Sequence, residues 1–111
     1  MEAATTQFKH CDLVTANGRV DSQSAPRLGE VFDAIIEAGR FKIVFDMSAV
    51  DYVSSAGLRV LIDAQKTCKR WGRGEVVLAA VPKQVYEVLE LVGFVPLFRF
   101  SDDATTAVGS F

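Results

Sequence analysis

Apolar residues follow two different spacings along the chain. In some segments nearly every residue is apolar, as in a strand buried on both faces, and in others apolar residues recur every three or four positions, as on one face of a helix. These segments predict strands at residues 8–20 (one or two strands), 41–47, 75–81 and 98–100. They predict helices from Pro26 to Gly39, from the serines at 54 and 55 to about Trp71, from Pro82 to Gly93, and after Ser101.

The alternation of strands and helices predicts an α/β fold. A helix that follows a buried strand packs back onto the same sheet and returns the chain to a parallel neighbour, so the central sheet is expected to be mostly parallel. We expect about four to five strands and about four helices. With 111 residues the chain supports one hydrophobic core, so we expect a single domain over residues 1–111 with its core at about 8–108.

Composition narrows the classes of function. The formal net charge is −2 and no basic stripe runs along the chain, which argues against a nucleic-acid partner. No apolar stretch reaches the length of a membrane span and the first residues lack the pattern of a signal peptide, so we expect a cytoplasmic protein. Cys11 and Cys68 lack the spacing of a metal or redox motif and are expected to be reduced and packed. No metal or cofactor is expected.

The strand over 41–47 and the helix that follows are joined by a segment ending in two adjacent serines, Ser54 and Ser55. A serine at a helix start caps the helix, because its hydroxyl accepts a hydrogen bond from the free amides of the first turn. The positive end of the helix dipole also favours an anion, and a phosphate on either hydroxyl would add about two negative charges. Two interpretations stay open: the serines serve only as caps, or the turn is phosphorylated or contacts a partner.

Together with the serine pair, several short motifs in this order resemble the STAS domain and, within it, the anti-sigma factor antagonists. Ser55 matches the serine that is phosphorylated in that family, and Gly57 and Leu58 match its Gly-Leu pair. Asp46 matches the acidic residue that ends the preceding strand, and Asp21, in the motif Gly-Arg-Val-Asp, matches an acid near the serine turn. The resemblance covers nearly the whole chain.

The resemblance implies a binding protein of a bacterial partner-switching pathway that regulates transcription through a sigma factor. The unphosphorylated form would bind an anti-sigma factor that is a serine kinase, phosphorylation of Ser55 would release it, and a cognate phosphatase would reverse the change. The residues implied in partner binding are Asp21, Asp46, Ser54, Ser55, Ala56, Gly57 and Leu58. A monomer or weak dimer is expected. No nucleophile stands beside a base and no phosphate-binding glycine loop occurs, so an enzyme is not expected.

Two other functions stay open, the first of them because many phosphorylated members of the family have Asp where this chain has Ser54. The first is a STAS subunit that is not phosphorylated and belongs to a larger assembly, such as a stress-sensing scaffold or a lipid-transport complex. The second is a STAS domain that binds a nucleotide, although the sequence offers no phosphate loop for it.

Three further features carry alternatives of their own. Gly57 stands in the first turn of a helix, which predicts a close approach by a neighbouring strand or by a partner. Asp21 and Asp46 are either a pair of carboxylates or two separate solvated acids. A cluster of cations near the end of the second helix either complements the helix dipole, the favoured interpretation, or forms a docking patch for an acidic partner. The cluster consists of Lys66, Lys69, Arg70 and Arg73.

Overall fold

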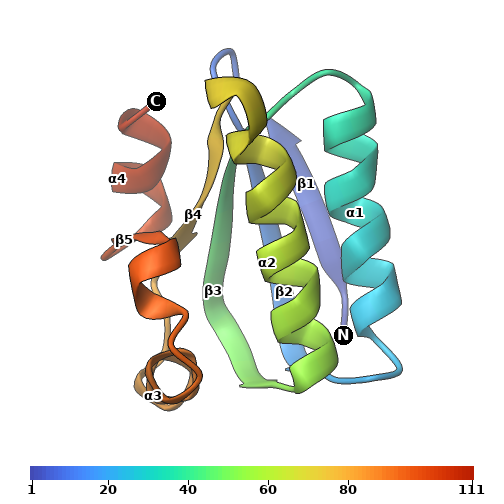
Figure 1. Cartoon of the computed structure of the whole chain (residues 1–111), viewed down its shortest axis with the longest axis vertical. Coiled ribbons are helices and arrows are strands. Elements are labelled where there is room, and N and C mark those ends of the chain that lie inside the picture. Colours follow the sequence, from blue (N-terminus) through green and yellow to red (C-terminus); the bar gives the residue numbers. More distant parts are fainter.

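A computed structural model describes residues 1–111 as one five-stranded sheet with the order β1-β2-β3-β4-β5 (Figure 1). Only the β1–β2 pair is antiparallel, so the prediction of a mostly parallel α/β domain is confirmed. The strands are β1 (Ala3–Gln7), β2 (Asp12–Val20), β3 (Lys42–Val53), β4 (Glu75–Ala79) and β5 (Arg99–Ser101). The helices are α1 (Ala25–Glu37), α2 (Ser55–Lys69), α3 (Lys83–Leu91) and α4 (Ala104–Gly109), with two short 3₁₀ turns, η1 (Arg70–Gly72) and η2 (Val95–Leu97).

Helices cover both faces of the sheet, and the alternation of side chains along β3 shows the two layers. Ile43 and Phe45 point to one face and join the larger core cluster, to which α1, α2 and α3 contribute. Val44 points to the other face and joins a smaller cluster with Ala107 of α4. Figure 1 shows α1 and α2 side by side over one face of the sheet. Because the first half of β3 is covered on both sides, its buried residues are all apolar: Ile43, Val44, Phe45 and Met47.

The third strand is longer than the sequence predicts. It continues from Met47 to Val53, because β2 pairs with it as far as the partners Val20 and Val53. The expectation that the strand ends at Met47 was therefore wrong. The second half was missed because it is less apolar and includes exposed residues. The pairing contains register shifts, one of them next to Gly18, whose positive φ of 74° suits a bulge.

The N-terminal hairpin also departs from the prediction, which placed the first strand at residue 8. Residues 8–11 connect β1 to β2, with the amide of Phe8 donating to the carbonyl of Cys11 (2.8 Å). Arg40, just beyond α1, forms an ion pair with buried Asp12 and donates to the carbonyl of Phe8 (2.6 Å). The strand β1 is mostly exposed and polar, so no hydrophobic pattern marked it, and its pairing with β2 holds it in the sheet.

The two cysteines are free and buried, as the sequence predicts. Burial raises the pKa of the Cys68 thiol to about 11, which keeps it in the unreactive protonated form at neutral pH. Among the helices, none combines the length and apolar character that crossing a membrane requires.

Candidate functional site

The turn between β3 and α2 holds the two serines, and the structure assigns them different tasks. Ser54 is the N-cap of α2, with extended backbone angles (φ −83°, ψ 174°), and its hydroxyl accepts a hydrogen bond from the amide of Gly57 (3.3 Å). The amide of Ser54 donates to the carbonyl of Val20 at the end of β2 (2.8 Å). Ser54 therefore joins the helix start to the sheet.

Ser55 is the first residue of α2, and its side chain is exposed. Its hydroxyl makes no hydrogen bond within the chain, because the capping task falls to Ser54. The positive end of the helix dipole lies at this position, where an added anion is favoured. The Ser55 hydroxyl is thus the chemically available group of the turn.

The next residues of the motif are packed against the sheet. A β-carbon on Gly57 would lie 2.8 Å from Cγ1 of Val20 and 2.9 Å from Cγ1 of Val53, so of the two predicted causes the neighbouring strands explain this glycine. Leu58 is only 7% exposed and belongs to the main core cluster. Ala56 is half-buried. Ser55 therefore offers the most accessible surface among these four residues.

Asp21 follows β2 and lies beside the serine turn, since the preceding residue, Val20, pairs with Val53 and binds the amide of Ser54. Its carboxylate accepts hydrogen bonds from the amides of Gln23 (3.0 Å) and Ser24 (3.1 Å). These bonds, that from Ser24 first, lower the pKa of Asp21 below its usual value. The acid thus shapes the entry to α1, a structural task that the sequence analysis did not assign to it.

Asp46 lies elsewhere in the sheet. It stands opposite Thr15 and Ala79, and Val53 lies seven positions further along β3, which corresponds to about 23 Å of extended strand. Its carboxylate accepts a hydrogen bond from the amide of Ser48 (2.9 Å). The expectation that Asp46 ends the strand was therefore wrong, and Asp21 and Asp46 do not form a pair of carboxylates. No group of three or more His, Cys, Asp or Glu side chains is placed to hold a metal ion.

Sequence reasoning missed a cation close to the turn. The guanidinium of Arg19 lies over the ring of Tyr52, 4.1 Å from its centre, and the two residues are partners across β2 and β3. A polar hollow of about 400 Å³ beside it is lined by residues that include Arg19, Asp21 and Arg27. No local motif predicts this cluster, because the register shifts in the pairing of β2 with β3 determine which side chains come into contact.

Comparison with known proteins places the chain among recognisable relatives. The STAS domain family matches residues 2–107. A protein of Bordetella bronchiseptica, BtrV, which is named as a candidate anti-sigma factor antagonist, is 34% identical over 99 residues, covering 89% of this chain and 84% of BtrV. The anti-sigma-B factor antagonist of Listeria monocytogenes is 26% identical over 84 residues, covering 76% of this chain and 72% of that protein.

Solved structures agree on the fold. An anti-sigma factor antagonist from Mycobacterium paratuberculosis superposes with a TM-score of 0.86 at 19% identity, over 98% of this chain and 92% of the other. The anti-sigma factor antagonist SpoIIAA in its unphosphorylated form gives a TM-score of 0.83 at 12% identity, over 98% of this chain and 95% of the other. A sulfate transporter family protein from Wolinella succinogenes also matches, with a TM-score of 0.79 at 22% identity, over 95% of this chain and 87% of the other. At such identities these likenesses establish the architecture and leave the function to the site residues.

Proposed function

Because the chain belongs to the STAS domain family, and within it to the anti-sigma factor antagonists, we propose that it binds an anti-sigma factor that is a serine kinase and is released when Ser55 is phosphorylated. A cognate phosphatase would restore the binding form. In this proposal the protein acts by binding alone, without catalysis, as a monomer or weak dimer in the bacterial cytoplasm.

The observation that carries the proposal is the division of tasks between the two serines. Ser54 caps α2, whereas Ser55 is exposed and its hydroxyl is free. A phosphate on Ser55 would therefore leave the cap bond intact and would lie at the positive end of the helix dipole. The fold can accept the modification, so its effect would fall on the surface presented to a partner.

The effect on binding follows from charge and desolvation. A phosphoserine carries about −1.5 to −2 charges at neutral pH. At the centre of a docking surface this dianion repels acidic groups of the partner, and against an apolar patch it loses part of its hydration without compensation. Asp21 and Ala56 border the same turn and are proposed to lie within the docking surface. Buried Gly57 and Leu58 are proposed to act there by positioning the turn, while Asp46 would contact the partner only at a distance from Ser55.

A second candidate function rests on Ser54. Many phosphorylated members of the family have Asp at this position, whereas this chain has a serine whose hydroxyl caps α2. The alternative is a STAS subunit of a scaffold or lipid-transport complex that binds its neighbours without being phosphorylated. The two candidates differ in one measurable property, the phosphorylation of Ser55.

Phosphosite mapping tests the proposal. The protein is incubated with ATP, Mg²⁺ and each candidate anti-sigma factor kinase from the same genome, and the products are analysed by mass spectrometry. We expect one phosphate on Ser55, its loss in Ser55→Ala, and its retention in the matched control Ser48→Ala, which changes another exposed serine. If no candidate kinase modifies the chain although one binds it, the unphosphorylated subunit is the better description.

A further inference from the structure

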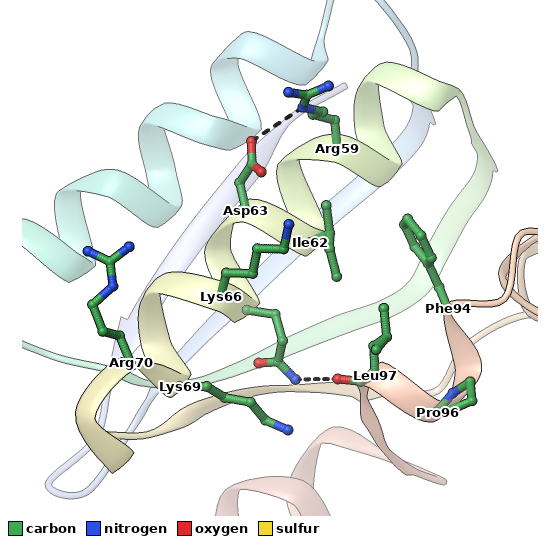
Figure 2. Close-up of a pocket in the computed structure, with 10 residues that line it drawn as sticks. Arg59, Ile62, Asp63, Lys66, Lys69, Arg70, Phe94, Pro96 and Leu97 are labelled. Carbon is green, nitrogen blue, oxygen red and sulfur yellow. Dashed lines mark hydrogen bonds and ion pairs between the residues drawn. The ribbon is translucent and has the colours of Figure 1, made fainter.

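A groove runs between α2 and η2, on the part of α2 that follows the serine turn (Figure 2). Its volume is about 940 Å³. Its apolar residues come from both walls: Ile62 from α2, and Phe94, Pro96 and Leu97 from the segment around η2. Leu97 is 41% exposed, so part of this apolar surface is open to water.

One buried side chain, Gln65, joins the two walls of the groove. Gln65 is buried between its walls, where its amide nitrogen donates to the carbonyl of Leu97 (2.9 Å) and its oxygen accepts from the amide of Val76 (2.6 Å). One side chain therefore ties α2 both to η2 and to β4. Because both ends of this buried amide are satisfied, the separation of the two walls is fixed.

The rim of the groove is cationic. Arg59, Lys66, Lys69 and Arg70 line it, against a single acid, Asp63, whose partner is Arg59 at 3.8 Å. The whole chain has a net charge of −2, so this local excess of positive charge stands out from the rest of the surface. Neighbouring cations repel one another, and an anionic partner would relieve that repulsion.

A large exposed aromatic residue follows the last rim cation in sequence, although its side chain does not line the groove. Trp71 directly follows Arg70 and is 85% exposed. Its backbone has a positive φ of 62°, which is uncommon for a bulky residue. An exposed tryptophan next to cations is typical of a docking surface, where aromatic residues and arginine are enriched.

From these observations we propose that the groove docks an acidic amphipathic helix of a protein partner. The rim cations on α2 extend from Arg59 to Lys69, a rise of about 15 Å, which matches about three turns of a second helix. A helix can place carboxylates along that whole length and apolar side chains on the groove floor. A fatty acid or a similar amphiphile carries one charge, which would neutralise a single cation and leave the others unpaired.

This inference goes beyond the proposed function, because it needs neither a kinase nor a phosphate. It also favours one of the two interpretations of the basic cluster, a docking patch for an acidic partner, over a role limited to the helix dipole. Lys66, Lys69 and Arg70 still complement the dipole at the end of α2, but their common edge with an apolar groove favours the docking patch. Arg73 lies apart from them, since its guanidinium covers the ring of Phe41 at 3.8 Å.

Binding of a model peptide to the full chain tests the proposal. The probe is a fluorescein-labelled helical peptide of about 18 residues, five turns, with Leu along one face and Glu elsewhere. We expect saturable binding by fluorescence anisotropy, and about tenfold weaker binding of the same peptide with Lys in place of Glu. Amide chemical shifts should move within residues 59–70 and 94–97. The emission of Trp71, the single tryptophan, should shift to shorter wavelength on binding.

Two variants make the test specific. Lys66→Glu reverses a rim charge and should weaken binding about tenfold, whereas Lys83→Glu makes the same charge change on α3, outside the groove, and should leave binding within about twofold. Both positions are exposed, so both variants should fold, and melts followed by circular dichroism check this. The proposal is overturned if the wild type does not bind the peptide or if both variants weaken binding equally. It is also overturned if phosphatidylglycerol vesicles bind in its place with the same dependence on Lys66.

Discussion

Gly57 in the first turn of α2 lies against Val20 at the end of β2, where a β-carbon on the glycine would stand 2.8 Å from Cγ1 and 3.2 Å from the carbonyl oxygen of Val20. Real β-carbons avoid such distances, so the helix reaches this position only because residue 57 has no side chain. The same carbonyl accepts the amide of Ser54. The contact therefore fixes the position of the serine turn relative to the sheet.

Gly57→Ala should destabilise the protein although alanine is the better helix former. The gain in helix propensity is about 1 kcal/mol, whereas forcing a methyl group against Val20 and Val53 costs about 1–3 kcal/mol, so we expect a net loss of about 1 kcal/mol. Gly29→Ala in α1 is the matched control, because its β-carbon would meet only Val60, at 3.7 Å. That variant should gain up to about 1 kcal/mol. Urea unfolding measures both, and equal stabilisation of the two variants would contradict the close contact.

The two serines should differ in their effect on stability. Ser54→Ala removes the hydroxyl that caps α2 and should cost about 1 kcal/mol, within the range of about 0.5–2 kcal/mol for such caps. Ser55→Ala removes an exposed hydroxyl without a partner and should stay within about 0.5 kcal/mol of wild type. Thermal melts of the two variants compare these values. A larger loss for Ser55→Ala would mean that the cap has been assigned to the wrong serine.

A charge at position 55 should act on binding before it acts on folding. Ser55→Asp places a carboxylate at the positive end of α2, so its melting temperature should stay close to that of wild type. Its affinity for the anti-sigma factor should fall, through repulsion and desolvation, while Ser55→Ala keeps the wild-type affinity. Calorimetric titration of the three proteins tests this prediction. Wild-type affinity of Ser55→Asp would place the turn outside the interface.

Asp21 should contribute to the dependence of stability on pH. The amides of Ser24 and Gln23 bind the carboxylate and lower its pKa in the folded state. A group with a lowered pKa stabilises the fold above its unfolded pKa of about 3.9, and the contribution disappears as the pH falls through the folded pKa. Asp21→Asn should therefore be less stable than wild type at neutral pH, with a gap that closes in acid.

Melts from neutral to strongly acidic pH measure this gap. Asp103→Asn is a second instance, since the amide of Thr106 lowers the pKa of Asp103 at the cap of α4, and its gap should close in the same direction. A gap that keeps the same size at every pH would show that the charge of Asp21 does not stabilise the fold.

Replacing Gln65 should destabilise the protein more than replacing an exposed polar residue. Gln65→Leu keeps the approximate size of the side chain but leaves the carbonyl of Leu97 and the amide of Val76 without their partner. The Val76 amide is buried and leaving it unsatisfied costs about 1–3 kcal/mol, whereas Leu97 is partly exposed and its carbonyl adds less, so we expect a loss of about 1–3 kcal/mol. Gln84→Leu, on the exposed surface of α3, is the control and should change stability by less than about 0.5 kcal/mol. Similar losses of stability in both variants would contradict the role of the Gln65 hydrogen bonds in holding the groove walls together.

Much of the fold was predictable because short sequence patterns determine where its helices begin and which of their faces are buried. The cap and spacing of α2 and Pro82 at the start of α3 lie where the sequence predicts them, since capping and helix periodicity depend on residues within a turn or two. The last helix also follows Ser101 as predicted, but its cap is Asp103. The end of β3 and the strand β1 were misjudged. The strand β1 is polar and mostly exposed, and the end of β3 buries only Val50 and Val53 between exposed residues, so neither shows a continuous apolar run. Hydrogen bonds to β2 hold both in the sheet.

The sequence by itself determined the family, the succession of strands and helices, and the serine pair at the start of α2. The resemblance to the family already implied that Asp21 lies near the serine turn. Only the tertiary structure decided that Ser54 is the cap and Ser55 the free hydroxyl, and that Asp46 lies far along β3. The same holds for the groove, where Gln65 meets a segment 32 residues away. Such neighbours depend on strand register, bulges and long-range packing, in which residues far apart in sequence come together.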